Sequence, residues 1–234
     1  MHMKKIGFIG AYDKTDLMLY IAKILTILNK KVLIIDDTIN QKARYIVPAI
    51  NPTTKYVTDF EDIDIAVGFC SILDIKNYLG LPEEQELEYD IALIDTDKAE
   101  GFTDFELETA YKNYFVTSFD NYSLKKGLEV LSTLQNVVNL TKVLFSKDIL
   151  KEDDDYLNFL SLGYKVVWNE YRIYFPIENG DLSVIYENQR LAKIKLKKLS
   201  AQYKDGLAYL VEEILGDVSE TNIRRAIKFN EKGV

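Results

Sequence analysis

The chain has 234 residues and carries 29 Lys and Arg against 37 Asp and Glu, a formal net charge of −8. This balance argues against attachment to DNA or anionic lipid through net charge, and the 47% of apolar residues excludes a disordered chain. A single cysteine, Cys70, allows neither an internal disulfide nor a paired-cysteine zinc site, and a single histidine, His2, leaves no catalytic triad or histidine-rich metal site. These features are typical of a cytoplasmic protein. No apolar run predicts a signal peptide or a membrane span.

The first segments predict a strand–helix–strand unit. Residues 5–10 are apolar and end in glycine, as a buried strand would, and residues 32–35 form a second such strand. Between them, apolar residues recur on one face of a predicted helix, for which Asp13 is the candidate N-cap. About 35 residues for this unit favour parallel strands joined by a right-handed crossover.

The alternation continues along the chain. Further strands are predicted at 63–67, 91–94, 114–117, 142–145, 165–168 and 173–175. Helices are predicted at 72–79, 123–134, 154–162 and 191–215, the last broken near Gly206. The pattern predicts an α/β fold with a doubly wound, mostly parallel sheet of about seven or eight strands and helices on both faces. Residues 5–10 are expected at the centre, beside 32–35 and 91–94; residues 3–216 form one domain and 217–234 a polar tail.

Polar residues follow three of the predicted strands. They are the loop 10–15, the pair Asp36-Asp37 and the run 95–97. In such sheets ligands bind at the carboxyl ends of the strands. A loop that opens a helix with Lys14-Thr15 is where a P-loop holds phosphates, with the lysine on the phosphates and the threonine hydroxyl on Mg²⁺. An Asp that ends a later strand, such as Asp95, is a usual Mg²⁺ partner.

Five segments of the chain, taken in their order and spacing, resemble the MinD/ParA group of P-loop ATPases. This group has a deviant Walker A motif and includes TadZ- and CpsD-like branches. The segments are 10–15 (Walker A), 32–37 (Walker A′), 89–96 (Walker B), 116–128 and 175–179. The resemblance implies a P-loop NTPase-like fold, ATP and Mg²⁺ as cofactors, and a dimer that meets face to face across the nucleotide. It implies nucleotide-binding roles for Gly10, Ala11, Tyr12, Asp13, Lys14, Thr15 and Pro176. It also implies catalytic roles for Asp36 and Asp95, and Mg²⁺ ligation by Thr15 and Asp95 if nucleotide binds.

The Walker A region departs from that pattern. Phe8 and Asp13 stand at the two glycine positions, Ile9 replaces the group's additional lysine, and Asp97 replaces a proline. At about 4 Å and an effective dielectric constant of about 20, a carboxylate repels each phosphate charge by about 4 kcal/mol. We therefore interpret the nucleotide site as eroded, with ATP hydrolysis slow or lost.

Structural explanations compete with these roles. Asp13 can be a helix cap, Asp36 and Asp95 can be solvated turn residues, and Cys70 can be a small buried side chain. A basic, partly apolar segment around residues 223–229 can be a weak membrane hook or a solvated helix face.

The sequence leaves three functions open. The first is a dimerising positioning or assembly factor of a partition, secretion, pilus or conjugation machinery, acting with protein partners. The second is an active ATPase with an atypical P-loop and an ATP-dependent dimer switch. The third is a binding module for another anion. For the first, we predict an ATP-independent homodimer through a face formed by Tyr12, Asp13, Asp97 and Phe102.

Overall fold

One eight-stranded sheet organises the computed structural model, which describes residues 3–50, 53–147 and 151–232. The strands are β1 (Lys4–Ile9), β2 (Val32–Asp37), β3 (Tyr56–Asp59), β4 (Asp64–Val67), β5 (Ile91–Thr96), β6 (Lys112–Ser118), β7 (Val138–Ser146) and β8 (Val166–Pro176). Their order is β3-β4-β2-β5-β1-β6-β7-β8, and only the β3–β4 pairing is antiparallel. The predicted fold class is confirmed.

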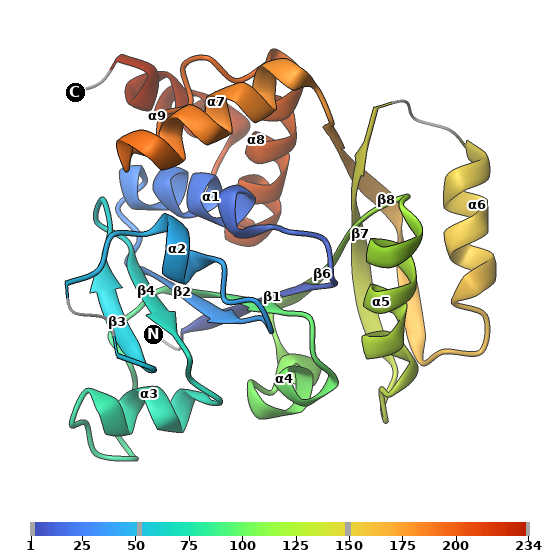
Figure 1. The fold of residues 1–234 in the computed structure, drawn as a ribbon, viewed down its shortest axis with the longest axis horizontal. Coiled ribbons are helices and arrows are strands. Elements are labelled where there is room, and N and C mark those ends of the chain that lie inside the picture. Colours follow the sequence, from blue (N-terminus) through green and yellow to red (C-terminus); the bar gives the residue numbers. More distant parts are fainter. Residues whose placement is uncertain (1–2, 51–52, 148–150, 233–234) are drawn as a thin grey trace.

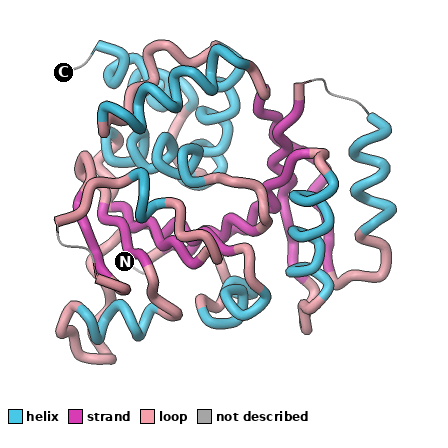
Figure 2. Tube along the Cα trace, viewed as in Figure 1, coloured by secondary structure: helices cyan, strands magenta, loops and turns pink. Residues whose placement is uncertain are grey.

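The helices cover both faces of the sheet (Figures 1 and 2). They are α1 (Thr15–Ile27), α2 (Ala43–Ile46), α3 (Ile72–Tyr78), α4 (Ala99–Asp104), α5 (Asn121–Ser132), α6 (Lys151–Leu160), α7 (Asn179–Leu191), α8 (Ala201–Leu215) and α9 (Glu220–Lys232), with a 3₁₀ turn at Leu107–Thr109. In Figure 1, α1, α7, α8 and α9 lie above the sheet and α3 and α4 below it. Strand alternation divides the core accordingly: Phe8 of β1 points into the α1 layer, and Ile9 into the layer that contains α4 and α5.

The order of the central strands differs from the prediction. β1 lies between β5 and β6, and β2 pairs with β5 and β4, so Val32–Ile35 is not beside β1. β1, β2 and β5 are all buried apolar strands. Their composition therefore marks them as internal, but it cannot rank equally apolar strands within the sheet.

The carboxyl-terminal third also differs from the prediction. Of the helix expected over 191–215, only the part from 201 onward is present, as α8; residues 192–200 are not helical, and α7, which ends at Leu191, lies in a segment where no helix was predicted. Gly206 lies inside α8 against the Phe175 ring and does not break it. The two strands expected near 165–175 are one strand, β8. Residues expected in a polar tail form α9, which packs on α1 and α8 and buries Ile223 and Ile227. The main apolar residues of the suggested membrane hook thus belong to the core.

At the β8 edge, a buried ion pair holds α6 against the sheet. The Lys142 ammonium lies 2.7 Å from Asp154 Oδ1 and 5.1 Å from the centre of the Trp168 ring. Trp168 Nε1 donates a hydrogen bond to Ser161 Oγ at 2.9 Å.

Two further observations complete the fold. Cys70 is exposed and not buried as suggested, because it lies in the loop that leads into α3. Among the helices described, none is long and apolar enough to cross a membrane.

Candidate functional site at the carboxyl end of the sheet

The loop between β1 and α1 turns sharply at Gly10. Its φ is +133°, and a Cβ there would lie 2.3 Å from the carbonyl oxygen of Val116 on β6. Only glycine combines this left-handed conformation with so close a backbone approach. The loop therefore passes close against β6, and Lys14 at the start of α1 reaches Asp95 near the carboxyl end of β5.

Lys14 is buried at the centre of this loop. Its Nζ lies 2.6 Å from Asp95 Oδ1 and donates a hydrogen bond to the Gly10 carbonyl at 2.6 Å. Burial raises the pKa of the Asp95 carboxyl to about 7, although the Lys14 charge lowers it and the Asp36 charge raises it further. The predicted phosphate lysine and the predicted magnesium aspartate are therefore each other's partners.

Asp13 lines the site and is itself paired. Its Oδ2 forms an ion pair with Lys42, whose ammonium also lies 3.3 Å from Asp16 Oδ2. Its Oδ1 accepts a hydrogen bond from the backbone N–H of Thr15 at 3.2 Å. The helix N-cap is Lys14, without a side-chain cap. The predicted N-cap, Asp13, thus lies one residue before the observed N-cap, while its carboxylate still accepts from the first turn.

Asp36 and Asp37 end β2 and point to different partners. Asp36 is buried and accepts hydrogen bonds from Thr38 N at 3.0 Å, Thr38 Oγ1 at 2.6 Å and Ala43 N at 2.9 Å. It therefore fixes the loop that carries Lys42. The Asp37 carboxylate, not singled out as a site residue from the sequence, lies 2.6 Å from Lys98 Nζ and accepts from Thr96 Oγ1 at 3.0 Å.

These elements enclose a cavity of about 340 Å³, called here the carboxyl-end cavity. Its lining consists of Gly10, Ala11, Tyr12, Asp13, Lys14, Thr15, Thr38, Asn40, Lys42, Tyr45, Asp95 and Asp97. The structure thus brings together all of the predicted loop residues and Asp95. The predictions missed Thr38, Asn40, Lys42 and Tyr45, because the loop after β2 and the four-residue helix α2 have no apolar pattern. Their only signal in the sequence is that they follow a strand that ends at the same edge of the sheet.

Pro176 lies outside this cavity. It lines a neighbouring cavity of about 210 Å³ together with Tyr12 and Asp13. The Tyr12 ring stacks on Phe145 at 4.6 Å between centroids, and Phe145 stacks on Phe175 at 5.1 Å. Burial raises the pKa of the Tyr12 hydroxyl to about 12. Tyr12 therefore lines both cavities as a neutral side chain.

The aromatic face predicted for dimerisation is wrong in one residue. Phe102 is 2% exposed, because α4 turns it into the core. Exposed apolar side chains on or beside the elements that border the cavity include Ile39, Tyr45 and Tyr122. Tyr122 is in the first turn of α5, and this helix approaches the loop where a Cβ on Gly127 would lie 3.5 Å from Ala11 N.

Among the residues that the structure describes, no group of three or more His, Cys, Asp and Glu side chains gathers where it could hold a metal ion. The two predicted magnesium ligands are Thr15 and Asp95. Thr15 is buried at the start of α1, and the Asp95 carboxylate is engaged by Lys14.

Sequence comparisons identify no relative: no protein-family model and no curated protein matches the chain. Comparison with solved structures does find a shared fold. An ATP complex of a McdA variant from Cyanothece aligns with TM-score 0.59 and 11% identity, covering 93% of this chain and 98% of that one. The MinC:MinD cell division complex from Aquifex aeolicus aligns with TM-score 0.58 and 15% identity over 93% and 97% of the two chains.

A third solved structure agrees. The putative plasmid partition protein of Borrelia burgdorferi bound to AMPPNP aligns with TM-score 0.53 and 10% identity, covering 93% of this chain and 99% of that one. Sequence identities this low support a shared fold but not a shared function. Over most of its length, this chain therefore has the fold of the ParA, MinD and McdA ATPases.

Proposed function

We propose that this protein is a positioning or assembly factor with a ParA/MinD-like fold whose nucleotide site is eroded and whose dimer forms without ATP. The observation that carries the proposal is the Lys14–Asp95 ion pair. It engages the one P-loop cation that the sequence retains, at 2.6 Å and in a buried setting. A phosphate could recruit Lys14 only by leaving Asp95 without its partner.

The charges of the carboxyl-end cavity support the proposal. Lys14 and Lys42 face the carboxyl groups of Asp13, Asp95 and Asp97, so the net charge is −1 when all three are ionised and 0 when Asp95, whose pKa is about 7, is protonated. An anionic ligand gains little in such a cavity unless a carboxylate is protonated. Mg·ATP fits these residues poorly, and we assign no hydrolytic step to them.

The positions at which the family pattern has a glycine and an additional lysine also support an eroded nucleotide site. Phe8 and Ile9 are fully buried on opposite sides of β1, and the Phe8 ring packs 5.2 Å from that of Tyr114. These side chains fill the core beneath the loop. A glycine at position 8 would remove a core ring, and a lysine at position 9 would bury its charge in the α4–α5 layer.

Dimerisation is proposed through the face formed by Ile39, Tyr45 and Tyr122. All three side chains are more than 60% exposed, on or beside the elements that border the cavity. Exposed aromatic residues frequently anchor interfaces. We further propose that the protein is cytoplasmic and acts with protein partners of a larger machinery.

Two measurements test the proposal. Isothermal titration with Mg·ATP and Mg·ADP is expected to give no binding at micromolar concentrations, and sedimentation is expected to show a dimer with or without nucleotide. The variant Ile39→Ser/Tyr122→Ser should be monomeric, while Phe159→Ser, which removes an exposed ring on α6, should remain dimeric. If the wild-type protein sediments as a monomer both with and without nucleotide, the proposed dimer is wrong.

The active-ATPase alternative has one specific observation in its favour. The loop keeps Lys14 and Thr15 at the start of α1, beside an aspartate that ends β5. Dimerisation only in the presence of ATP, with steady phosphate release of about 1 per second or more, would favour this alternative. The anion-binding alternative rests on Lys42, which reaches the same cavity from the loop after β2.

A further inference from the structure

A second and larger cavity lies at the opposite end of the sheet. It measures about 520 Å³ and is called here the amino-end cavity. Its residues come from the starts of β2 and β4, from the segment before β5 and from the loop after α3. They are Lys31, Val32, Asp62, Asp64, Leu79, Leu81, Gln85, Leu87, Glu88 and Tyr89.

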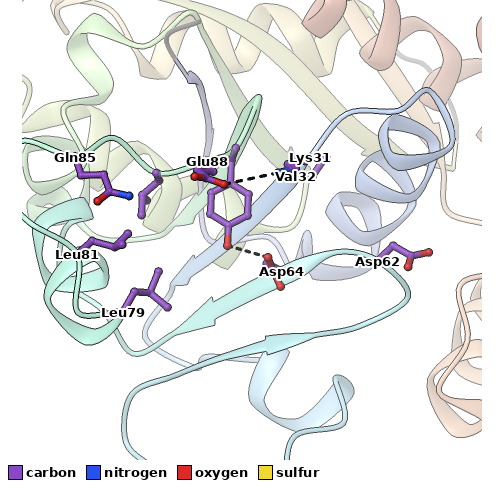
Figure 3. A pocket seen from close by; sticks show the side chains of 10 residues that line it. Lys31, Val32, Asp62, Asp64, Leu79, Leu81, Gln85 and Glu88 are labelled. Carbon is purple, nitrogen blue, oxygen red and sulfur yellow. Dashed lines mark hydrogen bonds and ion pairs between the residues drawn. The ribbon is translucent and has the colours of Figure 1, made fainter.

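The two sides of this cavity have different chemistry. Figure 3 shows Leu79 and Leu81 on one side and Asp64 on the other, with Glu88 above them facing Lys31. The Tyr89 hydroxyl donates a hydrogen bond to Asp64 Oδ2 at 2.8 Å and thereby holds that carboxylate in place. The cavity thus combines apolar surface, an aromatic ring and an oriented negative charge.

The charge of the amino-end cavity is unbalanced. The carboxylates of Asp62, Asp64 and Glu88 line the cavity with one ammonium group, of Lys31, and the Lys23 ammonium lies 3.8 Å from Asp62 Oδ2. Two positive and three negative charges give a net charge of −1. Lys31 Nζ lies 3.9 Å from Glu88 Oε2, and both side chains are at least 70% exposed. An exposed pair at this distance is weak and easily displaced by another cation.

We propose that the amino-end cavity binds an arginine side chain that a partner protein presents between apolar residues. The guanidinium group donates in a planar fork suited to carboxylates and stacks on aromatic rings, which Asp64, Glu88 and Tyr89 supply. The aliphatic stem and its apolar neighbours pack on Leu79 and Leu81. A cavity of about 520 Å³ holds more than one side chain.

The experiment uses the full chain and a short fluorescein-labelled peptide with the central sequence Leu-Arg-Leu, followed by fluorescence anisotropy. Its matched partner carries citrulline, which keeps the shape of arginine and removes the charge. The arginine peptide is expected to bind at micromolar concentration and the citrulline peptide at least about tenfold more weakly. Equal affinities, or no binding of the arginine peptide at about 1 mM, would overturn the proposal.

Two variants locate the effect. Asp62→Asn/Asp64→Asn/Glu88→Gln removes the three charges and keeps side-chain shape, and asparagine tolerates the left-handed φ of +68° at position 62. Asp155→Asn/Glu170→Gln/Glu178→Gln changes the net charge equally at exposed positions elsewhere. The first variant should weaken arginine-peptide binding at least about tenfold and the second should leave it unchanged. Equal weakening by both would reduce the effect to net charge and refute the site.

The exposed Glu88 provides a variant with little risk to folding. Glu88→Gln alone should weaken the arginine peptide about threefold and leave the citrulline peptide unaffected. Unchanged arginine binding in Glu88→Gln and in the triple variant would contradict the proposal.

Discussion

The two ends of the sheet both hold charged cavities, but they use their charges differently. At the carboxyl end, Lys14 and Lys42 are each within 3.3 Å of an aspartate, and Lys14 is buried. At the amino end, Lys31 and Glu88 are exposed and 3.9 Å apart. A buried ion pair is costly to break and resists a competing ligand, whereas an exposed, loose pair costs little to replace. Formal charge alone therefore does not indicate which cavity is available to a ligand.

The largest effect is expected from a substitution that breaks the buried Lys14–Asp95 ion pair. Lys14→Met would leave the Asp95 carboxyl without its cation, and we expect a loss of about 3–5 kcal/mol in the free energy of unfolding at pH 8. Urea denaturation measures it. Adding Asp95→Asn should restore part of the loss, because the amide carries no charge to bury. A loss under about 1 kcal/mol would mean that the pair is not needed for the fold.

The pH dependence of the free energy of unfolding tests the same buried Asp95 carboxyl. The folded-state pKa of Asp95 is raised to about 7, so its contribution to stability is fully present below its unfolded value of 3.8 and is lost as the pH rises to about 7. Burial raises the pKa values of Asp16 and Asp37 in the same direction. The free energy of unfolding should fall between about pH 4 and pH 7, by at most about 1.4 kcal/mol per pH unit for each proton. Asp95→Asn should flatten this slope, and an unchanged slope in that variant would assign it to other groups.

Asp13→Gly tests the carboxyl-end cavity as a ligand site. Removing this carboxylate frees Lys42 from one partner and adds backbone freedom to the loop. We expect Mg·ATP affinity to rise at least about tenfold, equivalent to about 1.4 kcal/mol, as measured by isothermal titration. Asp16→Asn is the control, because it also faces Lys42 but lies in α1. No gain in a folded Asp13→Gly protein would mean that the loop is not a lapsed phosphate site.

The smallest effect is expected from Lys31→Gln at the amino end. Loss of an exposed pair at 3.9 Å should change the free energy of unfolding by less than about 0.5 kcal/mol. The same variant should bind the arginine peptide more tightly, because it removes the ammonium group that competes for the carboxylates of the amino-end cavity. Thermal unfolding and anisotropy measure the two outcomes, and weaker binding would contradict the proposed site.

The sequence predicts the fold better than the site because long apolar runs carry the signal for buried strands. Residues 32–35 and 91–94 were recognised as strands in this way. Neither run indicates which neighbour it pairs with, so the position of β5 between β1 and β2 was missed. Strand order depends on crossover packing, which no single segment encodes.

The site could be predicted only where it lies close to a strand in sequence. The loop residues and Asp95 follow strands directly and were found. Lys42 and Tyr45 enter the cavity from beyond the end of β2, at the N-cap and within α2, where the hydrogen bonds of Asp36 fix the preceding loop. The burial of Phe102 was likewise invisible, because it depends on the angle at which α4 meets the sheet.

Trp168 offers a built-in spectroscopic probe. It is the only tryptophan of the chain, and its indole is hydrogen-bonded to Ser161 and lies beside the Lys142 ammonium. Tryptophan emission therefore reports the contact between α6 and β8, not the chemistry at either cavity. A change in its intensity or wavelength during mild denaturation would time the opening of this edge separately from the loss of total helix signal in circular dichroism.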